Sequence, residues 1–172
     1  MPKPISPEHY QAVGEIVVVW AKLEAHLFQA LRNLSRLKMR EGLIVFWQMG
    51  CRERMTVLQG LVLARYPDKT NRNRQCFETL AKRLEVACVL RNITAHSIWL
   101  PGLKDDEVSP FDFDFRGSQA KVTGRGPKRL SYSPAALHKE ALKIDRLAED
   151  FKDFFTQSFG VRFLHSKKAS LD

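Results

Sequence analysis

The sequence predicts an all-α protein: a bundle of four to five helices with a short β-hairpin inserted before the last helix. Over long stretches, apolar residues recur at steps of three and four, which is the period of one helix face. One short stretch, residues 111–115, instead alternates phenylalanine and aspartate, as a half-buried strand does. The length of 172 residues and the apolar share of 44% suit a single globular domain over 1–172.

The first helix is expected to begin at Ser6, Pro7 and Glu8, which supply an N-cap residue, a first-turn proline and an early acid. It should continue to about Leu37, because six apolar residues keep the helical period: Ile16, Trp20, Leu23, Leu27, Leu31 and Leu34. Two shorter helices are predicted over about 41–49 and 52–65, and the second should stop before Pro67.

The fourth helix is predicted over about 73–99, with Pro101 and Gly102 ending it. A hairpin should follow, with strands at 111–115 and 120–123, inside an insertion of about 103–132. The last helix should open at Ser133 and Pro134 and end near Gly160, a C-cap residue. The helical core then covers about 7–160, and the tail after about residue 164 is expected to be frayed.

The charge balance points to an anionic partner, although basic proteins are common and the charge can serve solubility alone. Lysine and arginine number 28 and acids number 19, which gives a net charge of +9. No apolar run approaches the twenty residues of a membrane span, so no membrane partner is expected. The three cysteines are odd in number and form no C-x-x-C pair. We therefore expect no disulfide framework, small buried apolar roles, and a reducing, cytoplasmic setting.

Polar residues interrupt the most apolar part of the fourth helix. Nine of the fourteen residues from 86 to 99 are apolar and surround the whole circumference, which predicts a central helix. Arg91, Asn92 and His96 nevertheless lie within this stretch. Arg91 and His96 are separated by about 140° around a helix and roughly 7.5 Å along it. Aiming both at one point would therefore need a bent side chain or a second subunit.

The hexapeptide Arg91-Asn92-Ile93-Thr94-Ala95-His96 resembles the R-x4-6-H motif of HEPN domains (higher eukaryotes and prokaryotes nucleotide-binding). The order of elements is also similar to that family, from the long first helix to the last one. The resemblance implies an all-α homodimer with the two motif helices close together. It further implies a metal-independent endoribonuclease of the toxin or phage-defence type, with an antitoxin or other regulatory protein as a further partner.

Carried onto this sequence, the resemblance makes Arg91 and His96 the catalytic pair, and Asn92 matches the polar residue that often follows the arginine. RNA would be cleaved by attack of its 2′-hydroxyl, with His96 as acid or base and Arg91 on the phosphate. No cofactor is implied. No metal site is expected either, because the five histidines show no ligand spacing. Some family members carry a tyrosine that is adenylylated two positions after the histidine, but here that position is Ile98.

Two further assignments come from charge. The hairpin region carries basic residues with no acid between them, which could contact RNA phosphates: Arg116, Lys121, Arg125, Lys128 and Arg129. The alternative is a solvated loop, folded back onto the acidic residues 105–107. Glu24, beside the apolar face of the first helix, either pairs with Arg91 or is an ordinary solvated glutamate.

Two functional hypotheses follow from the sequence. The first is the metal-independent endoribonuclease, with RNA as its substrate and a site shared between two subunits. The second is a noncatalytic HEPN-like helical module that binds nucleotide, RNA or a protein partner. In the second hypothesis, Arg91 and His96 serve the structure or the dimer interface.

Overall fold

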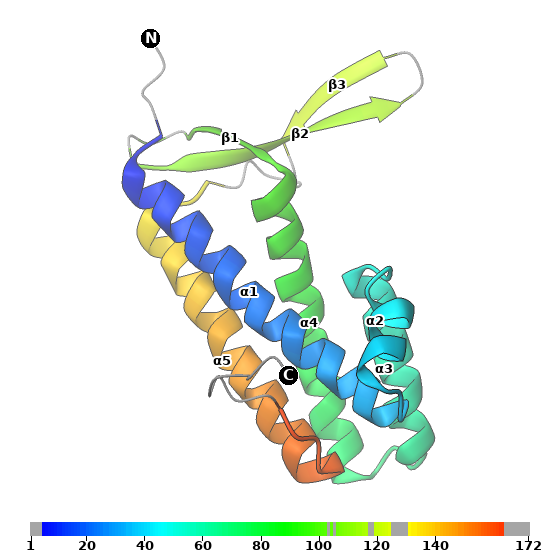
Figure 1. Ribbon diagram of the computed structural model, residues 1–172. Coiled ribbons are helices and arrows are strands. Elements are labelled where there is room, and N and C mark those ends of the chain that lie inside the picture. Colours follow the sequence, from blue (N-terminus) through cyan, green and yellow to red (C-terminus); the bar gives the residue numbers. More distant parts are fainter. Residues whose placement is uncertain (1–4, 103, 105, 117–118, 125–130, 164–172) are drawn as a thin grey trace, which may run out of the picture. The chain divides into compact units, whose positions relative to one another are not determined.

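A computed structural model describes residues 5–102, 104, 106–116, 119–124 and 131–163, and for residues 112–116 and 119–124 it describes only the backbone. The described elements are, in chain order, α1 (Pro7–Leu34), α2 (Met39–Phe46), α3 (Cys51–Arg65), α4 (Arg72–His96), β1 (Ile98–Pro101), β2 (Val108–Arg116), β3 (Gln119–Gly124) and α5 (Pro134–Phe159). Figure 1 shows these elements coloured along the sequence. The all-α class with a β-hairpin before the last helix is confirmed.

The chain forms two compact units, and each is built from two separate stretches of sequence. Unit 1 comprises Met1–Lys22 and Leu84–Leu147, and unit 2 comprises Leu23–Arg83 and Ala148–Asp172. Each of the three long helices, α1, α4 and α5, contributes residues to both units. No helix in the described part of the chain is long and apolar enough to cross a membrane.

In unit 1, the first half of α1 packs beside the first half of α5. Ala12, Ile16 and Trp20 on α1 are buried, as are Leu137 and Ala141 on α5. The start signal expected for α5 is used, since the Ser133 hydroxyl accepts the Ala136 N–H at 3.2 Å. Figure 1 shows β1 and the first part of β2 at the end where α1 and α5 begin.

The sheet of unit 1 has three antiparallel strands in the order β1-β2-β3. The β2–β3 hairpin was expected. Its register places Asp112 opposite Thr123 and Phe115 opposite Ala120. Strand β1 was not expected, because residues 98 and 99 were assigned to the fourth helix. Instead α4 ends at His96, and Ile98 pairs with Phe111 while Pro101 pairs with Val108. The backbone groups of β1 thus find partners in β2 rather than in another helical turn.

Unit 2 is held together by an aromatic cluster between α4 and α5. Phe155 is fully buried, and its ring centroid lies 4.6 Å from that of Phe151 and 6.1 Å from that of Phe77. The α5 helix ends as expected at Gly160, whose φ of +65° is a left-handed C-cap conformation. The α1 helix ends at Leu34, three residues earlier than expected, with Arg36 in the left-handed region.

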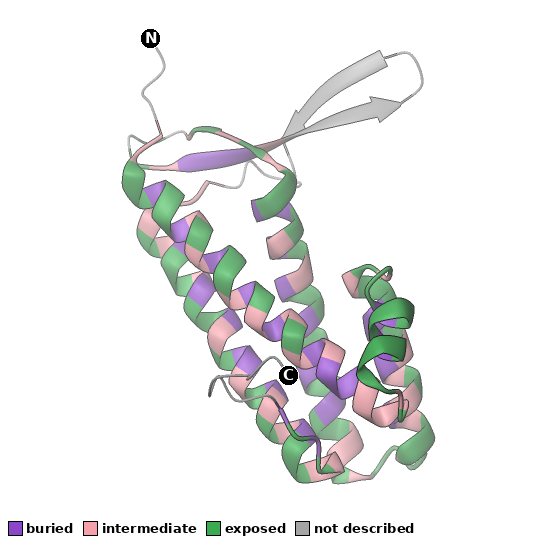
Figure 2. Ribbon diagram, in the orientation of Figure 1, coloured by how far each residue is buried: buried purple, intermediate pink, exposed green. Residues whose placement is uncertain are grey.

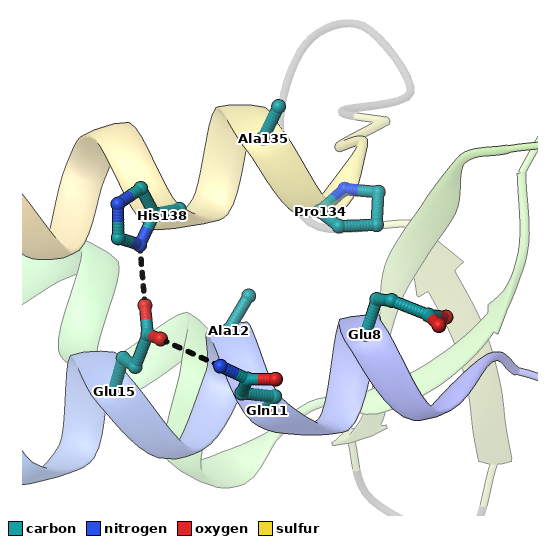
Figure 3. A pocket seen from close by; sticks show the side chains of 7 residues that line it. All are labelled: Glu8, Gln11, Ala12, Glu15, Pro134, Ala135 and His138. Atoms are coloured by element: carbon teal, nitrogen blue, oxygen red, sulfur yellow. Dashed lines mark hydrogen bonds and ion pairs between the residues drawn. The ribbon is translucent and has the colours of Figure 1, made fainter.

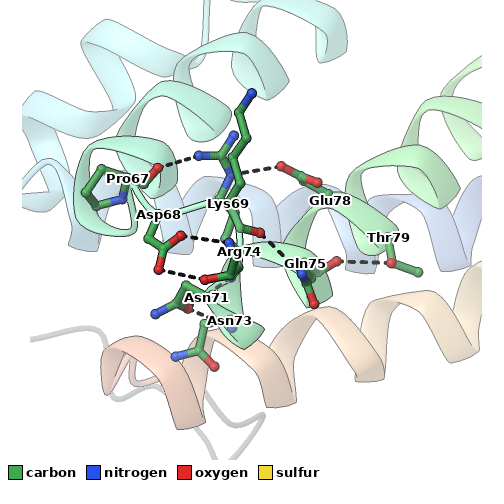
Figure 4. A network of polar contacts seen from close by, with 10 residues as sticks. Pro67, Asp68, Lys69, Asn71, Asn73, Arg74, Gln75, Glu78 and Thr79 are labelled. Carbon is green, nitrogen blue, oxygen red and sulfur yellow. Dashed lines mark hydrogen bonds and ion pairs between the residues drawn. The ribbon is translucent and has the colours of Figure 1, made fainter.

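The start of α4 is fixed by a polar network in the turn that follows α3 (Figure 4). The side chain of Asn71 accepts the N–H of Asn73 at 2.9 Å, which caps the helix. Arg74 donates to Glu78 at 2.9 Å and to the carbonyl of Pro67 at 2.7 Å. Hydrogen bonds from the backbone and the hydroxyl of Thr70 hold the pKa of Asp68 below its ordinary value.

Two expectations about burial are wrong. The second half of α4 is not surrounded, because Val86 is 71% exposed and Val89 is 60% exposed; Figure 2 shows buried and exposed residues alternating around the helices. None of the cysteines is a buried apolar residue either. Cys76 is exposed with a free thiol, whereas Cys51 and Cys88 are half-buried and disulfide-bonded. Disulfide bonding removes the observation on which the reducing setting rested.

Candidate functional site at the end of helix α4

Arg91, Asn92 and His96 lie together in the last two turns of α4. The Arg91 Nη1 atom donates to Oδ1 of Asn92 at 3.1 Å and lies 3.4 Å from Nε2 of His96. Arg91 is half-buried, while Asn92 and His96 are exposed. A single helix therefore brings the arginine and the histidine to one point. The arginine side chain is long enough to span the roughly 7.5 Å along the helix axis that separates the two residues.

Buried neighbours hold this end of the helix in place. Leu90 and Ile93 are buried, and the buried Thr94 hydroxyl donates to the carbonyl of Leu90 at 2.8 Å. The indole of Trp99 donates to the carbonyl of Thr94 at 3.4 Å. Trp99 also makes an edge contact with Tyr132, with ring centroids 6.1 Å apart. The polar residues are thus carried by a helix end that is anchored on its other side.

Among the residues that the structure describes, no acid neutralises the charge of the Arg91 guanidinium. In the ranges that the structure describes, neither Arg91 nor His96 forms an ion pair with a carboxylate. In the tautomer with its proton on Nδ1, Nε2 of His96 accepts a hydrogen bond from Nη1 of Arg91. A half-buried guanidinium beside an exposed imidazole can bind an anion such as a phosphate ester, and the imidazole can exchange a proton with it.

The exposed face of α4 that carries Asn92 and His96 also carries apolar residues. At 100° per residue, Val86, Val89, Asn92 and His96 fall within an arc of about 120°. All four are exposed. Exposed valines beside polar groups mark a surface on which another molecule can pack. We call these four residues the α4 face.

The basic residues of the hairpin are only partly described. Arg116 ends β2 and lies opposite Gln119, and Lys121 lies opposite Asp114. Arg125, Lys128 and Arg129 lie outside the described residues. Of the acidic stretch proposed as their partner, Asp105 lies outside the described residues as well. Glu107 forms an ion pair with Lys104 at 3.1 Å.

Glu24 takes neither of the roles expected for it. It is paired with Arg54, whose Nη1 atom lies 3.1 Å from Oε1 of Glu24. Arg54 is 7% exposed and also donates to the carbonyls of Phe46 at 2.9 Å and Trp47 at 3.3 Å. This arginine therefore neutralises a carboxylate on α1 and caps the end of α2, which is a structural role.

A second polar cluster, which sequence reasoning missed, lies between α1 and α5 (Figure 3). Nδ1 of His138 lies 2.6 Å from Oε2 of Glu15, and Gln11 donates to Oε1 of Glu15 at 3.2 Å. Glu15 and His138 line a pocket of about 240 Å³, together with Gln11 and Glu8. The hydrogen bonds from His138 and Gln11 hold the pKa of Glu15 below its ordinary value. The partners are 123 positions apart, so no local sequence signal could have joined them.

Within the described ranges, no cluster of three or more histidine, cysteine, aspartate or glutamate side chains is placed to hold a metal ion.

No family model matches the chain, and no curated protein or solved structure matches it significantly. Function is therefore inferred from the geometry of the α4 site and from the sequence motif that it carries.

Proposed function

We propose that the chain is a metal-independent endoribonuclease of the HEPN toxin or defence type, with Arg91, Asn92 and His96 in a composite site between two subunits. The observation that carries this proposal is the contact of 3.4 Å between Nη1 of Arg91 and Nε2 of His96 on an exposed helix end. Two side chains five positions apart ordinarily point to different sides of a helix, about 140° from each other. Because the two side chains converge, the motif supports the proposal through its geometry as well as through its sequence.

The chemistry requires an anion-binding group and a proton carrier at one point. The guanidinium of Arg91 holds the scissile phosphate and stabilises the charge that develops on its oxygens. The 2′-oxygen attacks phosphorus as His96 takes its proton, and the bond from phosphorus to the 5′-oxygen breaks. The departing 5′-oxygen takes a proton from the second imidazole of the dimer. The products are a 2′,3′-cyclic phosphate and a 5′-hydroxyl.

Asn92 has a positioning role in this scheme. Its Oδ1 atom accepts a hydrogen bond from the same Nη1 atom of Arg91 that faces His96. The amide therefore limits the orientations open to the guanidinium. Asn92 lies on the α4 face with Val86 and Val89, so dimerisation through this face brings a second set of the three residues close to the first.

The experiment is cleavage of total RNA and purified tRNA in excess EDTA, followed by analysis of the product ends. We expect cyclic-phosphate ends from the wild type and no cleavage by Arg91→Ala or His96→Ala. Arg72→Ala and His138→Ala replace exposed residues outside the site and serve as controls. Circular dichroism and sedimentation verify that each variant is folded and has the wild-type oligomeric state.

Two outcomes would reject this function. Cleavage by His96→Ala at the wild-type rate removes the assigned proton carrier. Absence of cleavage by a folded wild-type dimer, together with a lower melting temperature for Arg91→Ala, supports the noncatalytic helical module instead. In that case the α4 face is a binding surface for nucleotide, RNA or protein.

A further inference from the structure

Helix α2 presents large apolar side chains to solvent. Ile44 and Trp47 are each 68% exposed, and Met39 and Leu43 are also exposed. Among the residues of this helix, only Gly42 and Phe46 are buried. A surface helix normally turns its polar side outward, so this arrangement reverses the usual pattern. Clustered exposed apolar residues of this kind mark interaction sites.

The outward orientation of α2 is held by specific contacts. Arg54 donates to the carbonyls of Phe46 and Trp47 at the end of the helix and is itself paired with Glu24. At the start of the helix, the carboxylate of Glu41 accepts the N–H of Lys38 at 3.0 Å. Both ends of α2 are therefore fixed, and its apolar side is displayed by a formed structure.

The apolar surface of α2 is hollowed. Leu43, Ile44, Trp47 and Gln48 line a depression of about 420 Å³. These residues stand at positions i, i+1, i+4 and i+5, which surround a gap between neighbouring ridges of one helix. Such gaps receive single side chains from an opposing helix when two helices pack.

The sequence in and around α2 carries exposed basic residues, and Arg40 lies one helical turn before Leu43 and Ile44. Four exposed basic residues come from α2, α3 and the turn before α2: Arg36, Lys38, Arg40 and Arg52. None of them forms an ion pair with any residue in the described part of the chain. The two nearby acids, Glu41 and Glu53, are engaged by the backbone N–H groups of Lys38 and Gly50. Two copies of the chain meeting here would bring like charges together.

We propose that α2 is the docking site for an amphipathic helix of an acidic protein partner. An apolar side chain of that helix enters the depression, and flanking carboxylates meet the four exposed basic residues. This inference is independent of the proposed nuclease activity, because none of its residues belongs to the α4 site. It also assigns a surface to the regulatory protein partner that the sequence led us to expect.

The test uses two synthetic helical peptides with the same leucine ridge, one flanked by glutamates and the other by lysines. Binding of each labelled peptide to the full chain is followed by fluorescence anisotropy. We expect the acidic peptide to bind at least about tenfold more tightly than the basic peptide. Ile44→Asn should abolish this binding. Val18→Asn, which replaces an equally exposed valine on α1, should leave it unchanged.

A charge reversal sharpens the test. In the double variant Lys38→Glu and Arg40→Glu, the preference should shift towards the basic peptide while the apolar surface is intact. Equal affinity for the two peptides, no binding of either, or binding that survives Ile44→Asn would overturn the proposal. So would self-association of the chain that Ile44→Asn removes. Binding to phosphatidylglycerol vesicles, lost in Ile44→Asn, without binding of the acidic peptide would identify a lipid surface instead.

Discussion

His138 and Glu15 join two parallel helices across 123 positions of sequence, with Nδ1 of the histidine 2.6 Å from the carboxylate. Seven residues further along both helices, Lys22 donates to Asp145 at 2.8 Å, again across 123 positions. The constant offset means that α1 and α5 run in the same direction in unit 1. Parallel helices place their positive N-terminal ends together, and Glu8 in the first turn of α1 offsets part of that charge.

The Glu15 carboxyl should make stability depend on pH. Its pKa is held below the ordinary 4.5 by hydrogen bonds, chiefly from His138 and then from Gln11. The folded state therefore binds fewer protons than the unfolded state, and the stabilisation is present above 4.5 and lost as the pH falls through the folded value.

Urea unfolding of the wild type and of Glu15→Gln across this range measures the dependence. The wild-type advantage should shrink as the pH falls below about 5. Glu85→Gln replaces an exposed carboxylate on α4 and is the control. An advantage that stays the same down to about pH 3 would contradict the assignment.

Arg54 should be the most costly single arginine in unit 2 to remove. Arg54→Ala leaves Glu24 without its partner and the carbonyls of Phe46 and Trp47 without a donor. We expect a loss of about 2–4 kcal/mol in the free energy of unfolding, because Arg54 is buried while Glu24 keeps some contact with water. Arg52→Ala, at an exposed position, should change it by less than about 0.5 kcal/mol. Equal effects of the two substitutions would show that the Arg54 contacts are not stabilising.

The two glycines Gly102 and Gly14 should respond in opposite directions to alanine. A Cβ atom at Gly102 would lie 2.8 Å from Cβ of Glu107 and 2.9 Å from its backbone, so Gly102→Ala should displace the turn between β1 and β2. A Cβ at Gly14, inside α1, meets nothing within 4 Å. Gly14→Ala should therefore stabilise the protein by about 0.5–1 kcal/mol. Thermal unfolding of both variants checks the pair, and a stabilising Gly102→Ala would be inconsistent with the close approach to Glu107.

The α4 face should be required for the proposed homodimer. Val89→Glu places a charge among exposed valines, so sedimentation should show monomers and RNA cleavage should be lost. His96→Ala should lose cleavage and keep the dimer, which separates the chemical role from the assembly role. Val18→Glu, on the exposed side of α1, is the matched control and should alter neither. Full cleavage by a monomeric Val89→Glu variant would reject a site shared between subunits.

The parts of the fold that were predicted correctly are those set by local pattern. The apolar stripe of α5 and the glycine that ends it follow from residues within one or two turns of each other. The end of α4 was misassigned because the run from Ile98 to Leu100 is as apolar in a strand as in a helix. Pairing with β2, a partner distant in sequence, decides between the two. The exposure of Val86 was also hidden, because composition does not reveal which sides of a helix find neighbours.

The candidate site could also be predicted from a local sequence pattern. Arg91, Asn92 and His96 fall within six consecutive residues, so their spacing is visible in the sequence. The pair of Arg54 with Glu24 spans 30 positions, and neither residue carries a local signal for the other. Exposure of α2 was likewise beyond sequence reasoning, because its apolar residues read as part of the core until the packing is known.

The interleaving of the two units has a consequence for the order in which the chain can fold during synthesis. Unit 1 needs Met1–Lys22 and Leu84–Leu147, so the first half of α1 is made long before the partners that cover it. Glu15 cannot contact His138 until α5 has been synthesised and has left the ribosome. Until then, Ile16 and Trp20 lack the native packing contacts that this helix provides. The nascent chain therefore exposes an apolar surface during most of its translation, and a chaperone that shields α1 would have its greatest effect at this stage.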